Sequence, residues 1–185
     1  MISSKDRSGY IGASDTSTVM RNWNTKTFEQ WWRVKQGLTE NNISTDAMMA
    51  GTAYEHKILD ALKIPRLEKD KQIIIGRLRV NLDGNTAYKI YEVKTHSILK
   101  PFKVSLAYRQ QVNVEMYASG IKEACIVAYG LEEKDYRNYY RDIDAERLSF
   151  HEILYDEEFI EKYEKRMLYL SWCLETGTFP MEGAV

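Results

Sequence analysis

The stretch from Asn81 to Lys94 constrains the fold of this chain most, because an acidic residue in a Gly/Asn turn precedes a strand with a charged end. Side chains alternate between the two faces of a strand, so Ile90, Glu92 and Lys94 are expected on one face. That face runs from buried packing at Ile90 to charge at Lys94. A turn at residues 83–85 would fold the stretch into a hairpin and bring Asp83 near Glu92.

Two carboxylates and one ammonium would therefore meet at one end of the sheet. Asp83 and Glu92 repel each other unless a cation lies between them, and their oxygen atoms are ligands that suit Mg²⁺ or Mn²⁺. Lys94 beside such a metal could orient a water molecule or stabilise charge on a phosphate. The alternative is an ordinary turn aspartate followed by a solvated Glu-x-Lys strand face, and the flanking segments help to decide between the two.

Length and composition predict one soluble globular domain that spans residues 1–185. Apolar residues make up 44% of the chain and charged residues 29%, which are ordinary values for such a domain. No apolar run approaches the roughly 18 residues of a membrane-spanning helix. The N-terminal segment lacks the apolar core of a signal peptide, so we expect a cytoplasmic protein with no membrane partner.

The charged and cysteine residues exclude several classes of site. Cys125 and Cys173 are the two cysteines of the chain, which excludes a disulfide framework, a cysteine zinc site and a four-cysteine iron–sulfur cluster. The formal net charge is −1, so there is no global basic excess that would by itself attract nucleic acid. Any contact with DNA would need a local basic patch or bound metal ions.

Two segments before this stretch carry further candidate residues. Small residues precede Ser14 and Asp15, either of which is a good N-cap for a short helix through Met20. A helix N-terminus with a nearby hydroxyl is an anion site, and Arg7 could close it with its guanidinium group. The alternative is a plain capped helix.

A second helix is predicted over residues 47–62, with Thr45 or Asp46 as its cap. Glu55 flanks the apolar face of this helix, so its carboxylate could point into a cleft. The alternative for Glu55 is a surface position in a salt bridge.

The remaining hydrophobic periodicity predicts a mixture of helices and strands. Phe28 and Trp32 are expected to pack in the core, and Lys100 and Lys103 could face phosphate from a loop at the sheet end. Further helices are expected at residues 25–37, 105–119 and 156–176, and strands at residues 71–80, 123–130, 136–142 and 147–155.

Five motifs occur along the chain in a characteristic order: Arg7 with Ile11–Asp15, Gly51–Glu55, Leu82–Gly84, Tyr91–Lys94 and Gln111–Tyr117. Together they resemble the PD-(D/E)XK nuclease superfamily and, within it, the lambda exonuclease (YqaJ-type) branch of phage recombination nucleases. This branch often has a more proline-like residue where this chain has Asn81-Leu82. The resemblance implies an α/β fold with a restriction-endonuclease-like core, in which α-helices flank a central mixed β-sheet.

The resemblance also implies roles for single residues. Asp83 and Glu92 would hold the metal ions, Mg²⁺ or Mn²⁺, with the Val93 carbonyl as a further ligand. Glu55 would support the second metal position. Lys94 would activate the attacking water and Gln111 would help to position it. Arg7 and Ser14 would bind the 5′-phosphate of a DNA end.

The implied activity is that of a metal-dependent 5′ to 3′ exonuclease that degrades one strand of linear double-stranded DNA during phage-type recombination. The resemblance further implies a homotrimeric ring around the duplex and a single-strand annealing protein as a partner. Two alternatives are a structure-specific endonuclease on the same fold and a non-catalytic DNA-binding module. The complete set of Glu55, Asp83, Glu92 and Lys94 argues against the second alternative, because a silent site would tolerate the loss of any one.

Overall fold

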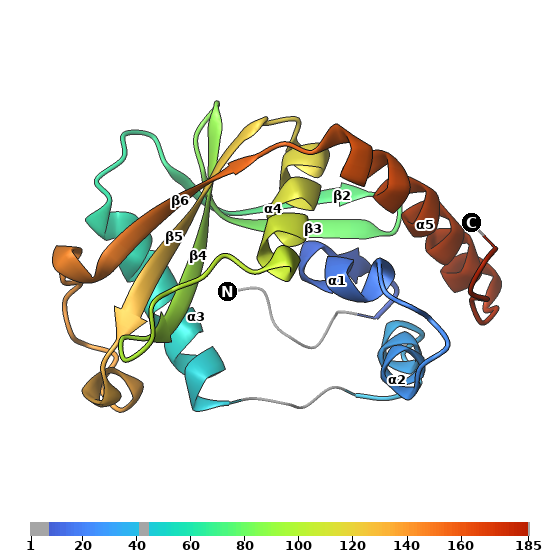
Figure 1. Ribbon diagram of the computed structural model, residues 1–185, viewed down its shortest axis with the longest axis horizontal. Coiled ribbons are helices and arrows are strands. Elements are labelled where there is room, and N and C mark those ends of the chain that lie inside the picture. Colours follow the sequence, from blue (N-terminus) through green and yellow to red (C-terminus); the bar gives the residue numbers. More distant parts are fainter. Residues whose placement is uncertain (1–7, 41–44, 185) are drawn as a thin grey trace.

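The computed structural model describes residues 8–40 and 45–184, and its centre is a six-stranded mixed β-sheet (Figure 1). The strand order is β1-β3-β4-β5-β6, and β2 also pairs with β3. The pairs β1–β3 and β4–β5 are parallel, whereas β2–β3, β3–β4 and β5–β6 are antiparallel. The strands are β1 (Ile11–Gly12), β2 (Glu68–Ile75), β3 (Leu78–Asn85), β4 (Lys89–Ser97), β5 (Glu123–Leu131) and β6 (Leu148–Leu154).

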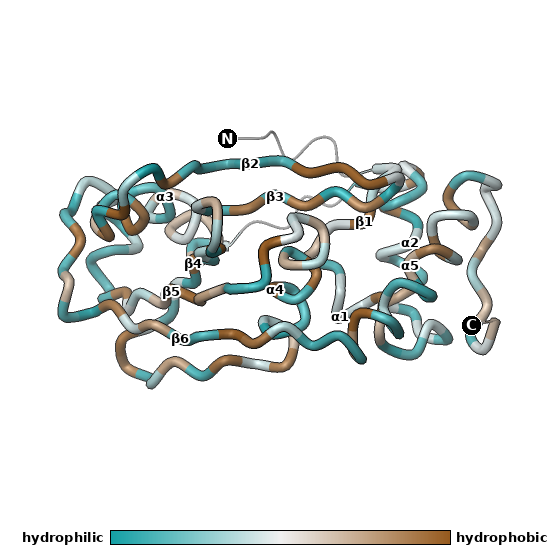
Figure 2. The backbone as a smooth tube through the Cα atoms, turned by 90° about the horizontal axis from the view of Figure 1, so that it is seen from above, coloured by the Kyte–Doolittle hydropathy of each residue, from teal (hydrophilic) through white to brown (hydrophobic). Residues whose placement is uncertain are grey.

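Helices flank this sheet, which confirms the predicted α/β class. Seen from above, α3 and α5 lie at opposite ends of the molecule and α4 lies between them (Figure 2). None of the described helices is long and apolar enough to cross a membrane. The helices are α1 (Thr16–Val19), α2 (Lys26–Lys35), α3 (Asp46–Ala61), α4 (Leu106–Ser119) and α5 (Glu157–Thr176), with short 3₁₀ helices at Ala13–Asp15, Glu133–Tyr136 and Ala145–Arg147.

The strand alternation of β4 and β5 divides the buried side chains into two clusters. One face carries Ile90 and Ile126, which belong to the cluster that α4 covers with Val112 and Met116. The other face carries Val93 and Val127 under α3, in a cluster completed by Ala50, Tyr54, Ile58, Leu59, Tyr129 and Leu131. Glu92 shares the face of Ile90, so its side chain is directed toward α4 and away from α3.

Local capping signals explain why the longer helices form where the sequence predicts them. Phe28 and Trp32 on α2 are buried as expected. Gly120 and Gly177 follow α4 and α5 with φ of +75° and +69°, a conformation that glycine adopts without steric cost. The helix N-caps are Thr25, Thr45, Ser105 and Asp156, whose side chains accept hydrogen bonds from the amides of Phe28, Met48, Tyr108 and Phe159.

The predicted strand at residues 71–80 is wrong, because the chain reverses direction within it. β2 ends at Ile75 and β3 begins at Leu78, with Gly76 at φ +56° in the turn between them. The turn predicted at residues 83–85 is also wrong. Those residues lie inside β3, and the reversal occurs at Thr86, whose hydroxyl accepts the amide of Lys89.

One further segment differs from the sequence prediction, whereas the short helix near Asp15 agrees with it. The tyrosine-rich segment 136–142 is not a strand but a series of 3₁₀ and turn residues, held by Arg141 and Arg147 on the buried carboxylate of Asp135. The short helix predicted from Ser14 or Asp15 through Met20 is present as α1, with Asp15 as its N-cap and Met20 as its C-cap, although the Asp15 carboxylate accepts the amide of Gly12 and no amide of α1. In the segment 136–142, ion pairs to Asp135 thus override the period-two pattern of a strand.

Gly84 sets how closely α3 approaches the sheet. A Cβ atom at this position would lie 2.9 Å from Cδ2 of Leu59, too close for two carbon atoms. The absence of a side chain therefore lets α3 pack directly on β3. This close packing brings Glu55 of α3 near Asp83, the residue that precedes Gly84.

Candidate active site

The candidate site begins where β3 and β4 separate. The two strands pair only at Gly84–Tyr91 and Asn85–Ile90 among the described residues. Beyond these pairs the amide of Val93 donates a hydrogen bond to Oδ2 of Asp83, at 2.8 Å. The separation leaves room between the strands, and both Asp83 and Glu92 lie at its margin.

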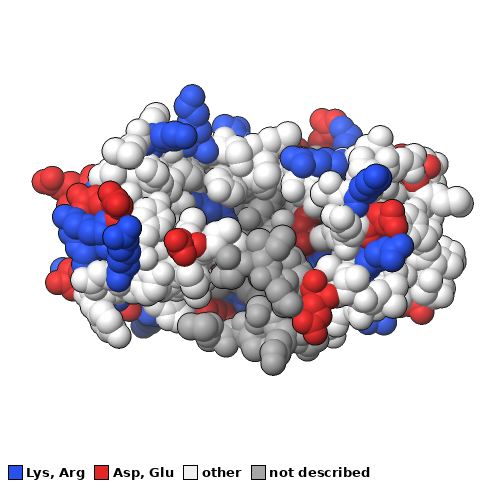
Figure 3. All heavy atoms as spheres, turned by 90° about the horizontal axis from the view of Figure 1, so that it is seen from below, with Lys and Arg blue, Asp and Glu red and all other residues white. Residues whose placement is uncertain are grey.

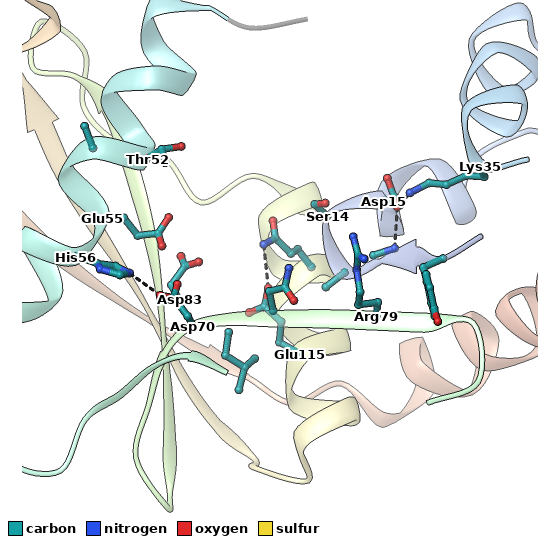
Figure 4. Close-up of a pocket in the computed structure, with 17 residues that line it drawn as sticks. Ser14, Asp15, Lys35, Thr52, Glu55, His56, Asp70, Arg79, Asp83 and Glu115 are labelled. Atoms are coloured by element: carbon teal, nitrogen blue, oxygen red, sulfur yellow. Dashed lines mark hydrogen bonds and ion pairs between the residues drawn. The ribbon is translucent and has the colours of Figure 1, made fainter. Parts of the chain in front are cut away.

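A cavity of about 460 Å³ opens at this point. Figure 4 shows Glu55 of α3 and Asp83 of β3 directed toward one another, with Glu115 of α4 on the neighbouring wall. Ser14 lies toward the opposite end of the cavity. The expectation that Glu55 points into a cleft is therefore confirmed in its geometry.

Behind the cavity wall, Glu92 and Lys94 form a hydrogen-bonded network with α4. Oε1 of Glu92 accepts the Lys94 ammonium at 2.6 Å and the Gln111 amide at 2.6 Å. Gln111 also donates to Glu115 at 2.9 Å and accepts from Lys94 at 3.2 Å. Gln111 lines the cavity, so it connects the buried pair to the space where a ligand would lie.

The electrostatics of this cluster are dominated by buried negative charge. Burial, followed by repulsion from Glu92, raises the pKa of the carboxyl groups of Asp83, Glu55 and Glu115 above their ordinary range. Burial alone would lower the pKa of the Lys94 ammonium, but the attraction of Glu92 outweighs it and raises that pKa. Lys94 is therefore charged at neutral pH, and one ammonium faces four carboxyl groups.

A divalent cation fits this donor set. Oε2 of Glu92 and Oε2 of Glu115 are buried and have no hydrogen-bond partner among the described residues. Buried polar atoms without a partner are unfavourable, and a cation at the carboxylates would satisfy them and relieve their repulsion. Carboxylate oxygens suit Mg²⁺ and Mn²⁺. The residues that would hold it are Asp83, Glu92 and Glu55, with the Val93 carbonyl as a predicted further ligand.

A second cluster of possible metal ligands adjoins this centre, and the sequence analysis did not predict its residues His56 and Asp70. Ligand atoms of Glu55, His56 and Asp70 lie within 4.8 Å of one another, and Nε2 of His56 lies 3.0 Å from Asp70. Asp70 has φ +57° in β2, where its neighbours Lys69 and Lys71 pair with Gly84 and Leu82 of β3. His56 follows Glu55 directly, but Asp70 reaches the site only through the β2–β3 hairpin, which the sequence analysis did not find.

The opposite end of the cavity contains cationic side chains. Ser14 is exposed there, whereas Arg7 lies outside the described residues. Lys35 of α2 pairs with Asp15 at 2.5 Å, and Arg79 of β3 rises toward the same loop (Figure 4). Lys100 and Lys103 are exposed on the loop after β4 and do not line the cavity.

We expect the removal of the Asp83 charge to stabilise the metal-free protein more at about pH 8 than at about pH 5. The ordinary carboxyl pKa values are about 3.9 to 4.3, and those of Asp83, Glu55 and Glu115 are raised in the folded state. Their contribution to stability is complete below about pH 4 and is lost as the pH rises through the raised pKa values. Thermal unfolding of wild type and Asp83→Asn with a chelator checks this difference, and an equal shift at both pH values would contradict it.

This chain is similar to known proteins in its fold, whereas no similarity is found in its sequence. No family model matches this chain, and no curated protein is significantly similar to it. Among solved structures, an alkaline exonuclease (LHK-Exo) from Laribacter hongkongensis superposes with a TM-score of 0.71 at 18% identity, over 92% of this chain and 90% of that chain. The chain has the fold of this exonuclease.

Two further solved structures share the architecture. A phage-related exonuclease from Haemophilus somnus 129PT has a TM-score of 0.63 at 14% identity, over 90% of this chain and 94% of that chain. A putative exonuclease from Eubacterium rectale has a TM-score of 0.58 at 8% identity, over 97% and 88% of the two chains. Similarity that covers nearly the whole of each chain shows that the mixed sheet and its helices form one common fold.

Proposed function

We propose that this protein is a divalent-metal-dependent exonuclease that degrades one strand of linear double-stranded DNA in the 5′ to 3′ direction. The observation that carries the proposal is the convergence of Asp83, Glu55 and Glu92 with Lys94 and Gln111 beside one cavity. The likeness in fold to three exonucleases supports it, and one of them, LHK-Exo, has also been solved in complex with dAMP.

Residues of this chain would supply metal binding, orientation of the attacking water and charge stabilisation, which phosphodiester hydrolysis requires. Asp83, Glu92 and Glu55 would hold Mg²⁺ or Mn²⁺, which supplies charge stabilisation at the phosphate and lowers the pKa of a bound water. Gln111 reaches the cavity and would orient the attacking water. Lys94 is held by Glu92 and Gln111, so its ammonium is fixed where negative charge develops.

DNA binding would depend on the site more than on a general charge attraction. Basic and acidic side chains are interspersed on the face seen in Figure 3, and the formal net charge is −1. Ser14 and Arg7 would hold the 5′-phosphate of the strand end, which fixes the direction of degradation.

A homotrimeric ring would retain the duplex, and a single-strand annealing protein would receive the product strand in phage-type recombination. Light scattering tests the ring, since a monomer would reject it while leaving the proposed chemistry intact.

We expect linear duplex DNA to be degraded with Mg²⁺ and circular duplex DNA to remain intact. The reason is that a site which captures a strand end has no substrate on a closed circle. Cleavage of the circle would instead identify an endonuclease, and binding without cleavage would identify a non-catalytic module. Linear duplexes labelled at the 5′ or the 3′ end report the direction of degradation, with a chelator as the matched control. Release of the 3′ label first would contradict the proposed direction.

A further inference from the structure

The cavity has two ends of opposite charge, and one face of β3 joins them. Arg79, Asn81 and Asp83 alternate along β3, and all three line the cavity (Figure 4). With a rise of about 3.3 Å per residue, the backbones of Arg79 and Asp83 lie about 13 Å apart. Asp83 faces the carboxylate of Glu55, whereas Arg79 lies beside the 3₁₀ helix of Ser14 (Figure 4). A ligand that spans the cavity would therefore meet carboxylates at one end and a guanidinium group at the other.

Arg79 is a cation without a neutralising partner in the part of the chain that the structure describes. Lys35 also lines the cavity, but its ammonium pairs with Asp15 at 2.5 Å. The guanidinium carbon of Arg79 lies 5.4 Å from the centre of the Tyr10 ring, and no hydrogen bond or ion pair joins its side chain to another described residue. Stacking on the ring restrains the guanidinium group while leaving its N–H donors for a ligand.

A phosphate is the ligand that this arrangement favours. The planar guanidinium group binds the oxygens of phosphate in bidentate fashion. Carboxylate ligands bind in the same way, but the acidic end of the cavity repels any anion that is not accompanied by a divalent cation. A strand of nucleic acid suits both ends of the cavity, because one of its phosphates can lie at Arg79 while another lies with a cation at Asp83.

We propose that Arg79 binds the terminal 5′-phosphate of the DNA strand and thereby positions the scissile phosphodiester at the carboxylates. This inference rests on the proposed nuclease function and adds a residue to the contacts proposed for Ser14 and Arg7. Arg79 is a positioning residue, because its fixed place on β3 determines which phosphodiester reaches Asp83. Phosphate binding at the Arg79 end needs no divalent cation, so it can be measured when cleavage cannot occur.

The test compares the binding of two labelled duplexes in the presence of a chelator, one with a 5′-phosphate and one with a 5′-hydroxyl. Hydrogen bonds between charged groups contribute about 1.5–3 kcal/mol, so wild type should bind the phosphorylated duplex at least about tenfold more tightly. Arg79→Gln should reduce this preference to about twofold or less while changing the affinity for the 5′-hydroxyl duplex little. Arg79→Lys, which keeps the charge and loses the planar fork, should retain an intermediate preference.

Arg109→Gln is the matched control, because Arg109 is an exposed arginine of α4 that lines a different hollow, next to β6. This variant should keep the full preference. Circular dichroism confirms that each variant is folded, and Arg79→Lys provides the result if Arg79→Gln does not fold. A preference that persists in Arg79→Gln, an equal loss in Arg109→Gln, or no preference in wild type would overturn the assignment.

The binding and cleavage results separate this inference from the proposed function. Degradation of linear DNA by a wild type whose phosphate preference does not depend on Arg79 would reject Arg79 alone. A preference that Arg79→Gln abolishes, in a protein that degrades no DNA with Mg²⁺ or Mn²⁺, would reject the nuclease function and support the phosphate site.

Discussion

Asp83→Asn should lose at least about a thousandfold in the rate of metal-dependent DNA degradation while remaining folded. Metal ions contribute several kcal/mol of transition-state stabilisation, and each 1.36 kcal/mol corresponds to a factor of ten in rate. The amide oxygen of asparagine can still accept the Val93 amide, which is bonded to Asp83 at 2.8 Å. The substitution therefore removes a negative charge from the cluster without removing this hydrogen bond between β3 and β4.

Unfolding measurements distinguish loss of the metal from loss of the fold. Ligands that bind the native state raise its stability, so Mg²⁺ or Mn²⁺ should raise the melting temperature of wild type and leave that of Asp83→Asn nearly unchanged. Asp60→Asn is the matched control, because Asp60 lies exposed on α3 in a surface ion pair with Lys69. Full activity in a folded Asp83→Asn protein would reject Asp83 as a metal ligand.

Lys94→Ala should retain DNA and metal binding but cleave about 10²- to 10³-fold more slowly. A single positioned electrostatic contact in an enzyme is worth about that much in rate. Lys94 donates to Glu92 at 2.6 Å and to Gln111 at 3.2 Å, so its ammonium is fixed before any substrate arrives. The loss should therefore appear in single-turnover cleavage with saturating enzyme, where binding does not limit the rate.

Lys89→Ala is the matched control for this variant, since Lys89 lies on the same strand and pairs with the exposed Glu152 at 2.7 Å. It should cleave at the wild-type rate. Equal losses of DNA affinity and single-turnover rate in Lys94→Ala would make Lys94 a phosphate anchor, which is a different role from the one proposed.

Local signals in the sequence were sufficient for most helices and for the charged end of β4. Thr25, Ser105 and Asp156 cap helices through bonds to amides three residues away, and such short-range bonds are visible in the order of residues. The alternation of a strand likewise placed Ile90, Glu92 and Lys94 on one face. The predicted approach of Asp83 to Glu92 is present in the structure, although their roles in catalysis remain predictions.

The positions of turns were harder to predict, because several residues nearby could reverse the chain. Gly84 and Asn85 have turn chemistry but lie inside β3, where Gly84 makes room for Leu59 of α3. The reversal at Gly76 falls within the run 71–80, which the sequence pattern indicates as one continuous strand. At Gly84 packing between elements, which no short window of sequence contains, decides the conformation, whereas at Gly76 a positive φ of +56° makes the turn.

Tertiary structure alone decided which distant residues complete the site. The order of residues shows that Gln111 and Glu115 share one face of a helix, but only the packing of α4 on β4 joins them to Glu92. Asp70 enters the cavity because the β2–β3 hairpin brings β2 alongside β3, whereas Arg79 lies on β3 itself and lines the opposite end of the cavity. Helices and strands form from backbone geometry and capping, which neighbouring residues determine. Contacts between distant segments form because apolar faces are buried against one another, and no local sequence pattern encodes those positions.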